Sequence, residues 1–448
     1  MRVTSDKSHN LLVDGIWAFF LKASAGLTQI VIAVFLTWNL SPEDFGLFQI
    51  AQRIFIFCAT IGAFGLGWIS VQKIANDFAL NDGDNSIGII IRMSLNVLIV
   101  SSAIGCLYII FFGVVNKTLF GVSFSGLEGL FFSIIVCLSL MQVVPEFLRG
   151  AHSIRKASIF SGFFSGAIFL FLISLFHVSG FELNLEHYFA LYFSSLLVAV
   201  VCSGASIYLL FKQCGALKRT DFNVDLRFLK QGAPILGSSL LLFIIGQADV
   251  WFVASLSSVE DAGYYAAAAK LVWVLTVPLM VLNSVVSPIT SRLLAKGERF
   301  KLERLLRATA TVTLVVSVLL GFILVVFPDL ILGLLFGSAY SKSSSVLQIL
   351  SLGQIVAVAL GPCSILLVMA GEQKQLLKTS VVSASVFVVL SMVLGPSFGA
   401  EGVAISVSAG FIISQALIAY IASVKLGVRT FFTLNLKSTD FNLAVRPI

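Results

Sequence analysis

The sequence predicts an all-α membrane protein that crosses the bilayer about twelve times, and three observations support this prediction. Of the 448 residues, 58% are hydrophobic and only 11% are charged, whereas roughly a quarter are charged in a soluble protein. Apolar stretches of roughly 20 residues, long enough to cross the hydrocarbon core, recur from one end of the chain to the other. The cations fall almost entirely in every second connection between these stretches. These observations exclude a soluble protein.

Apolar runs separated by polar turns predict six spans in each half of the chain. In the first half the spans are placed near residues 12–38, 45–71, 87–114, 124–148, 158–178 and 187–211. In the second half they are placed near residues 232–256, 262–290, 305–327, 343–370, 379–395 and 400–424. The predicted domains are therefore an N-terminal six-helix bundle (1–211), a polar cytoplasmic linker (212–231), a C-terminal six-helix bundle (232–424) and a cytoplasmic tail (425–448).

The distribution of Lys and Arg predicts that both termini face the cytoplasm. With twelve spans, all but five of the 29 cations fall in the segments on the side of the termini. Lys117 and Lys342 fall on the other side, and three cations lie within spans. Basic loops remain on the cytoplasmic side and meet the anionic inner leaflet. This arrangement accounts for the net charge of +7 without a nucleic-acid partner.

No metal or nucleotide motif accompanies these spans. The six cysteines and four histidines are dispersed, with no CxxC pair and no metal-ligand spacing, so the cysteines are interpreted as small buried hydrophobes. The sequence has no GxxxxGK[ST] loop, so no ATPase site of its own is expected. The sequence thus predicts a transporter rather than an enzyme, without a metal or an organic cofactor.

An internal repeat links two polar turns in the apolar chain. The stretch "LSPEDFGLFQIAQR" (40–53) is matched, 217 residues later, by "SSVEDAGYYAAAAK" (257–270). The shift places Glu43 and Asp44 on Glu260 and Asp261, Gly46 on Gly263, and Arg53 on Lys270. Acidic residues favour the start of a helix, so the four carboxylates are interpreted as helix-start caps, with an outer-gate role as the alternative.

A second correspondence supports two parallel six-helix bundles. The stretch "EFLRGAHSIRKAS" (146–158) matches "LVMAGEQKQLLKTS" (367–380), with Gly150 aligned on Gly371. Since the main shift spans six helices, both copies have the same topology. Such a layout predicts a transporter that works by alternating access around a central cavity.

Six charged residues in or near the spans are candidates for the site. Charges at membrane depth are costly and usually face protein or a watery cavity. Lys22, Arg53, Asp249 and Lys270 are expected to line a cationic substrate cavity suited to an anionic cargo. The alternative is structural, with Asp249 and Lys270 paired and Lys22 reaching toward the interface. Glu146 and Arg149, three residues apart, are expected to form a salt bridge at a helix end, with a cytoplasmic gate as the alternative.

The turn "LSPEDFGLFQIAQ", the turn "SVEDAGYYAAAAKLV" and the helix endings "RGAHSIRKAS" and "AGEQKQLLKTS" resemble the polysaccharide exporters, the Wzx-type O-antigen flippases. In this resemblance Ser41 replaces a common glycine. The resemblance implies a MATE-like fold. It also implies a protein that flips undecaprenyl-pyrophosphate-linked repeat units from the cytoplasmic to the periplasmic leaflet of the bacterial inner membrane, in lipopolysaccharide or other polysaccharide synthesis. It also implies coupling to a H⁺ or Na⁺ gradient or the membrane potential, and partners among membrane lipids and the polysaccharide polymerase and chain-length proteins.

Two other classes remain as alternatives. A MATE-type drug or cation antiporter shares the fold, and acidic residues would dominate its cavity. A membrane glycosyltransferase or ligase would act on the same lipid-linked substrate, but it would need a large outer loop or catalytic carboxylates. The longest outer connection expected here, near 328–342, is short.

Overall fold

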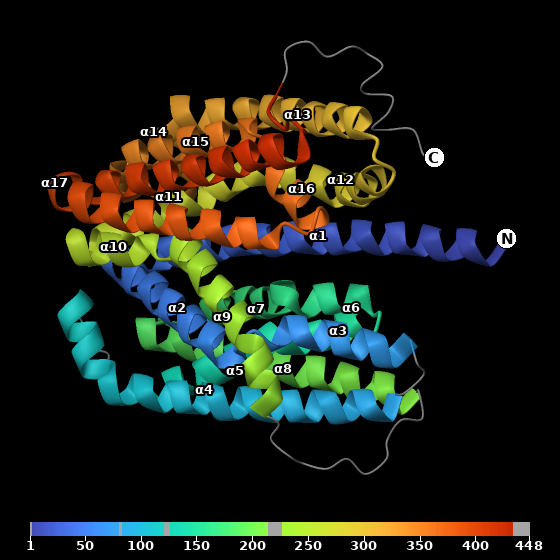
Figure 1. The fold of residues 1–448 in the computed structure, drawn as a ribbon. Coiled ribbons are helices and arrows are strands. Elements are labelled where there is room, and N and C mark those ends of the chain that lie inside the picture. Colours follow the sequence, from blue (N-terminus) through green and yellow to red (C-terminus); the bar gives the residue numbers. More distant parts are fainter. Residues whose placement is uncertain (1, 80–82, 121–125, 214–225, 433–448) are drawn as a thin grey trace. The chain divides into compact units, whose positions relative to one another are not determined.

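The computed structural model describes residues 2–79, 83–120, 126–213 and 226–432, and every regular element in these ranges is a helix (Figure 1). The predicted all-α class is therefore confirmed for this part of the chain. Most of the predicted linker 212–231 and most of the tail 425–448 lie outside the described residues.

The chain divides into two compact units. The first unit comprises Met1–Leu36 and Leu47–Phe243, and the second comprises Thr37–Gly46 and Ile244–Ile448. Two segments, 37–46 and 232–243, lie in the unit opposite to the bundle in which the sequence placed them. Each unit therefore contains a short segment from the other half of the sequence.

The first unit is built around α5. Its helices are α1 (Arg2–Asn39), α2 (Pro42–Ala63), α3 (Leu66–Ala79), α4 (Gly83–Phe120), α5 (Glu128–Gly150), α6 (Ile154–Ser158), the π-helix η1 (Ile159–Phe163), α7 (Phe164–Val178), α8 (Leu185–Gln213) and most of α9 (Leu226–Gln247). Helix α5 packs against α3, α4 and α8. Phe55, Phe131 and Phe189 meet in its core with ring centroids 4.8–6.1 Å apart. Such aromatic contacts stabilise a bundle in which apolar burial from lipid gains little.

In the second unit α15 has the central position. The helices are α10 (Asp249–Leu256), α11 (Val259–Val272), the 3₁₀-helix η2 (Trp273–Thr276), α12 (Val277–Ala295), α13 (Arg299–Val326), α14 (Pro328–Phe336), the 3₁₀-helix η3 (Ser338–Ser343), α15 (Ser344–Ala359), α16 (Cys363–Met369), α17 (Gln373–Ile421) and the π-turn η4 (Ala422–Leu426). Helix α15 packs against α11, α13 and α17. The outer connection expected near 328–342 is therefore mostly helical, formed by α14 and η3.

The number of spans agrees with the prediction once α17 is divided. The described residues contain 11 helical stretches long and apolar enough to cross a membrane, the last being Gln373–Leu426. Within it Gly399 has a non-helical backbone (φ 54°, ψ −132°). Beyond Gly399 the chain packs back on itself, since a Cβ on Gly402 would lie 2.4 Å from the carbonyl oxygen of Leu394. The two halves of α17 are thus separate spans, which brings the total to the predicted twelve (Figure 1).

Four predicted spans are interrupted in the described residues. The span 158–178 has non-helical backbone at Ser161 and Gly162 (φ 102°), and three other spans are each broken into two helices. The span 45–71 breaks at Phe64 and Gly65, which both have positive φ. The span 232–256 breaks at Ala248, and the span 343–370 breaks around Gly361. Apolar residues flank the breaks at Phe64 and Gly361, so hydropathy alone could not locate these two, whereas Gln247 and Asp249 flank Ala248.

The C-terminal ends of α5 and α16 match in a register different from the predicted one. His152 (φ 57°) donates its N–H to Arg149 O, and Ser153 donates to Leu148 O. In the second unit Gly371 (φ 76°) donates to Val368 O, and Glu372 donates to Leu367 O. Both ends are Schellman motifs. The counterpart of Gly371 is therefore His152 rather than Gly150, because the left-handed residue and not the residue type defines the turn.

The reversal at Gly399 makes a prediction about stability. Gly399→Ala places a Cβ in a conformation that L-residues rarely adopt, so we expect it to lower the free energy of unfolding by about 1–3 kcal/mol. The measurement is thermal unfolding of purified protein in detergent. The control is Gly204→Ala in α8, where an added Cβ meets nothing within 4 Å. Equal melting temperatures for the two variants would contradict the prediction.

Candidate functional site

The two copies of the repeated turn form the same helix cap. The backbone N–H of Asp44 donates to Ser41 Oγ at 3.1 Å, and that of Asp261 donates to Ser258 Oγ at 3.0 Å. Ser41 and Ser258 are themselves 217 residues apart. Serine at the N-cap with an acidic residue three positions later is the capping pattern that satisfies free N–H groups at a helix start.

The four acidic residues of the repeat therefore have two different positions. Asp44 and Asp261 lie in the capping box, where each carboxylate accepts a serine hydroxyl, from Ser41 and from Ser257 respectively. Glu43 and Glu260 occupy the same first turns and are exposed. Sequence reasoning assigned the caps to the carboxylates and missed the serines, although the spacing S-x-x-D is present in both copies.

The repeated glycines bring the first turns of α2 and α11 into backbone contact inside the second unit. A Cβ on Gly46 would lie 2.2 Å from the carbonyl oxygen of Val259, and a Cβ on Gly263 would lie 2.3 Å from that of Pro42. Pro42 and Val259 are also related by the 217-residue shift. The contact is therefore reciprocal, as a twofold relation between the repeats requires. Only glycine permits so close an approach.

An aromatic and charged cluster lies beside this crossing. Phe45 of α2 meets the ring of Tyr340 at 6.0 Å, and Tyr340 meets the ring of Tyr264 at 5.3 Å. Lys342 lies 5.2 Å above the ring of Tyr264 and 3.7 Å from the carboxylate of Glu260. Lys342, one of two cations predicted on the outer side, thus joins η3 to the start of α11. No sequence pattern indicated this cluster, because Tyr340 and Lys342 lie outside the repeat.

The candidate cavity residues are divided between the units. In the first unit, Lys22 is exposed on α1, and Arg53 on α2 is only 9% exposed. In the second, Asp249 is 8% exposed and Lys270 is partly buried. Asp249 begins α10, so it lies at a helix break and not in mid-helix as predicted, and its Oδ1 accepts the N–H of Val250 at 3.0 Å.

Asp249 and Lys270 lie on neighbouring helices, whereas the repeat partners Arg53 and Lys270 have different surroundings. Helices α10 and α11 pack against each other, which is compatible with the predicted proximity of Asp249 and Lys270. Helix α2 continues for ten residues beyond Arg53, to Ala63. Helix α11 ends two residues after Lys270, where η2 begins. Both cations therefore lie in helical backbone, and only in the second copy does a 3₁₀ turn begin a few residues later.

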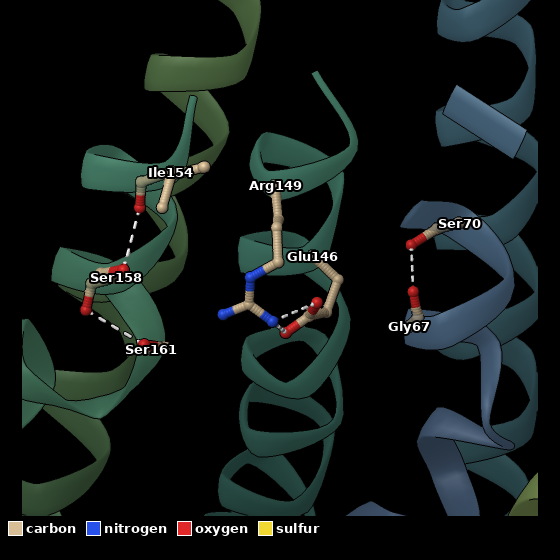
Figure 2. Close-up of polar contacts among 7 residues, drawn as sticks. All are labelled: Gly67, Ser70, Glu146, Arg149, Ile154, Ser158 and Ser161. Carbon is tan, nitrogen blue, oxygen red and sulfur yellow. Dashed lines mark hydrogen bonds and ion pairs between the residues drawn. The ribbon is translucent and has the colours of Figure 1, made fainter. Parts of the chain in front are cut away.

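The expected salt bridge at the inner end of α5 is present (Figure 2). Arg149 Nη1 lies 2.6 Å from both carboxylate oxygens of Glu146. Gly67 of α3 lies beneath the pair, since a Cβ there would be 3.2 Å from Glu146 Cγ. Figure 2 also shows Ser158 and Ser161 donating to backbone carbonyls beside η1. The pair lies within α5 and stabilises the end of that helix, and a gate role for it stays a prediction.

The turn between α12 and α13 carries part of the predicted cytoplasmic charge. Glu298 accepts a hydrogen bond from Lys301, with Nζ and Oε2 2.7 Å apart. This bond, aided by the charges of Lys296 and Arg292, lowers the pKa of Glu298. The carboxylate therefore stays ionised and balances part of a cluster of cations. Among the described residues no group of three His, Cys, Asp or Glu side chains has a metal-binding arrangement.

A bundle of twelve apolar spans with internal repetition is a multi-span membrane protein of the kind found among transporters. The profile of the family described as "Polysaccharide biosynthesis protein" matches residues 11–294, and the MatE profile matches residues 234–394. The chain therefore belongs to the polysaccharide biosynthesis protein family, and the predicted resemblance to polysaccharide exporters is confirmed at this level. No curated protein matches the chain.

Solved structures agree with this fold assignment. An inward-facing MATE multidrug resistance transporter of the MOP superfamily has a TM-score of 0.69 and 15% identity over 90% of this chain and 94% of its own. The lipid II flippase MurJ in an inward closed conformation has a TM-score of 0.67 and 14% identity over 97% and 90%. A MOP superfamily transporter from Pyrococcus furiosus, described as having a binding pocket of reverse polarity, has a TM-score of 0.56 and 13% identity over 92% and 94%. The chain thus has the MOP superfamily fold.

The glycine crossing makes a prediction about the repeat. We expect Gly46→Ala and Gly263→Ala each to lower the free energy of unfolding by about 1–3 kcal/mol, because the added methyl groups meet rigid backbone. Gly129→Ala in the first turn of α5, where a Cβ meets nothing within 4 Å, is the matched control. Melting temperatures in detergent provide the measurement. Variants as stable as the control would show that the two helix starts do not cross here.

The inner salt bridge makes a prediction that separates packing from gating. The pair is partly exposed, so we expect Arg149→Ala to lower stability by at most about 1 kcal/mol. If the pair only stabilises the C-terminal end of α5, transport in membranes should fall no further than this loss of stability explains. The double variant Glu146→Arg with Arg149→Glu should then restore the melting temperature. Loss of transport at wild-type stability would instead indicate a gate.

Proposed function

We propose that this protein flips undecaprenyl-pyrophosphate-linked oligosaccharide repeat units from the cytoplasmic to the periplasmic leaflet of a bacterial inner membrane by alternating access. The observation that carries the proposal is Arg53, a cation buried in the second span of a chain from the polysaccharide biosynthesis family. Its repeat counterpart is Lys270, and Lys22 adds a third cation along the spans. These residues, together with Asp249, are proposed to serve the translocation path.

Arg53 suits a diphosphate better than it suits a neutral sugar or a cationic drug. A guanidinium offers a planar fork of N–H donors that matches phosphate oxygens, and it stays charged even when buried. A charged group at membrane depth is kept where it is useful, because its insertion costs a few kcal/mol. The lipid tail can remain in the bilayer while the cations offset the diphosphate charge.

The same proposal specifies how the protein is oriented in the membrane. Both termini and the basic inner loops would face the cytoplasm, where the lipid-linked unit is assembled and the inner leaflet is anionic. The start of α2 and the start of α11, with Glu43, Asp44, Glu260 and Asp261, would then lie on the periplasmic side as outer-gate elements. Energy would come from a H⁺ or Na⁺ gradient or from the membrane potential, and polymerase and chain-length proteins would take over the delivered unit.

A MATE-type drug or cation antiporter is the second candidate. The MatE profile match over residues 234–394 and the inward-facing MATE structure favour it, and so does the buried carboxylate of Asp249. An antiporter of this kind needs an acidic group to exchange a proton for a cationic drug. Asp249 is one acidic residue against three cations in the spans, so the flippase proposal is preferred.

The test is restoration of the surface glycan in a strain that lacks its own flippase and makes the cognate repeat unit. We expect Arg53→Ala to reduce restoration by about 10–150-fold at matched membrane levels, because a hydrogen-bonded charge contributes about 1.5–3 kcal/mol. Arg53→Lys should retain part of the activity. Lys156→Ala, which removes an exposed cation of α6, is the matched control and should behave as wild type.

Two outcomes would count against the proposal. Full restoration by Arg53→Ala would show that this cation is structural. Failure of the wild-type chain itself, together with Asp249-dependent efflux of a cationic dye from membrane vesicles, would favour the antiporter. An Asp249→Asn variant in the dye assay decides between these cases.

A further inference from the structure

The break in the tenth span leaves two backbone carbonyls without helical partners. Helix α15 ends at Ala359, α16 begins at Cys363, and Gly361 between them has a φ of 80°. The N–H of Cys363 bonds to Gly361 O, at 2.9 Å, instead of to Ala359 O. Non-helical backbone at membrane depth is tolerated only where other protein groups satisfy it.

The segment 427–432, which follows the last span, supplies a partner to both carbonyls, and the thiol of Cys363 is a second donor to Leu360 O at 2.9 Å. The N–H of Phe432 donates to Ala359 O at 3.1 Å, and the hydroxyl of Thr430 donates to Leu360 O at 3.1 Å. Thr430 Oγ1 also lies 2.9 Å from Cys363 Sγ. A Cβ on Gly361 would lie only 2.4 Å from the carbonyl oxygen of Thr430, so the two backbones are in direct contact.

The segment is held by a small contact. Only Val428 and Thr430 are fully buried, whereas the rings of Phe431 and Phe432 are about two-fifths exposed. The remaining contacts are polar or at the edge: the N–H of Arg429 with Glu303 at 3.3 Å, and Arg307 over the ring of Phe431 at 5.4 Å. Apart from Val428, which belongs to an apolar cluster with Leu302, Leu305 and Leu366, these contacts exchange readily with water, so their loss would leave most of the apolar packing of the bundle in place.

The first unit provides a comparison. The shared Schellman motif aligns Leu148 with Leu367, which places Gln142 at the position of Gly361. There α5 runs unbroken from Glu128 to Gly150. In that copy the helix stays continuous, although Pro145 provides no N–H for the carbonyl of Met141, the counterpart of Leu360. The second unit therefore has a break, covered by the segment 427–432, where the first unit has a continuous helix.

We propose that residues 427–432 are a releasable latch on the inner end of the second unit. Docked, the latch completes the hydrogen bonding of the broken span and holds α16 in line with α15. Undocked, it leaves the break free to bend, so that α16 can tilt during the transport cycle. The proposal depends on the transporter fold and not on the identity of the cargo.

The first experiment measures release without any cargo. Single cysteines are placed at Thr430 and, as a control, at Thr379 in α17, in a chain whose native cysteines are replaced; the two sites are 0% and 3% exposed. Release predicts that a maleimide reacts with Thr430→Cys at least tenfold faster than with Thr379→Cys. Equal rates would show that the segment is a fixed part of the bundle, and this result would overturn the proposal.

The second experiment locks the latch. Thr430→Cys in a chain that retains only Cys363 brings two sulfurs within bonding range, and copper phenanthroline serves as the oxidant. We expect the disulfide to reduce glycan restoration at least tenfold, and dithiothreitol to recover it. The control is Thr430→Cys with Cys363→Ala, which the oxidant should not affect. A disulfide without loss of transport, or no disulfide at all, would overturn the latch.

These two experiments also separate the latch from the proposed cargo. If the unlocked reference chain fails to restore the glycan, the flippase proposal fails, while the maleimide rates still decide whether the latch opens. If the reference chain restores the glycan and the lock has no effect, the latch fails and the flippase proposal stands.

Discussion

The fold depends on one constraint: inside a bilayer, each backbone N–H and C=O group must find its partner within the protein. Long helices meet this requirement by themselves, but four spans in the described part of the chain are interrupted. At two of the breaks, glycine allows another segment to approach the exposed backbone. Gly232 of α9 lies against the carbonyl of Phe64, and Gly361 lies against that of Thr430. The breaks are thus possible because a neighbouring backbone can come unusually close.

The same requirement explains what the two repeats have kept and what they have changed. The serine caps and the crossing glycines are the same in both copies, because they satisfy helix starts and permit close contact. The residues that follow have diverged. Arg53 lies in a continuous helix, whereas Lys270 is followed by a 3₁₀ turn. The framework is therefore symmetric, and the chemistry placed on it is not.

Hydropathy and charge were sufficient to predict the all-α class, twelve spans and the repeat, because burial in lipid imposes length and apolarity on every span. The break at Gly361 could not be predicted in this way, since the residues on both sides are apolar, whereas Gln247 and Asp249 on either side of Ala248 were a polar signal that the prediction did not use. The cap serines were detectable from spacing alone. The register of Gly371 was wrong because matching residue types ignored which residue has positive φ. The contacts of Tyr340 and Thr430 depend on packing between distant segments, for which a single sequence carries no signal.

The glycine crossing also has a consequence for biogenesis. The segment 37–46 belongs to the second compact unit, but the ribosome makes it 217 residues before its partner at Gly263. At about 5–20 residues per second, this interval is roughly 10–40 s. During that time the outer ends of α1 and α2 are already in the membrane, with Phe45 and Gly46 uncovered. The nascent protein must therefore keep an unfinished surface in lipid until the seventh and eighth spans arrive, and membrane chaperones would have their main opportunity to act in this window.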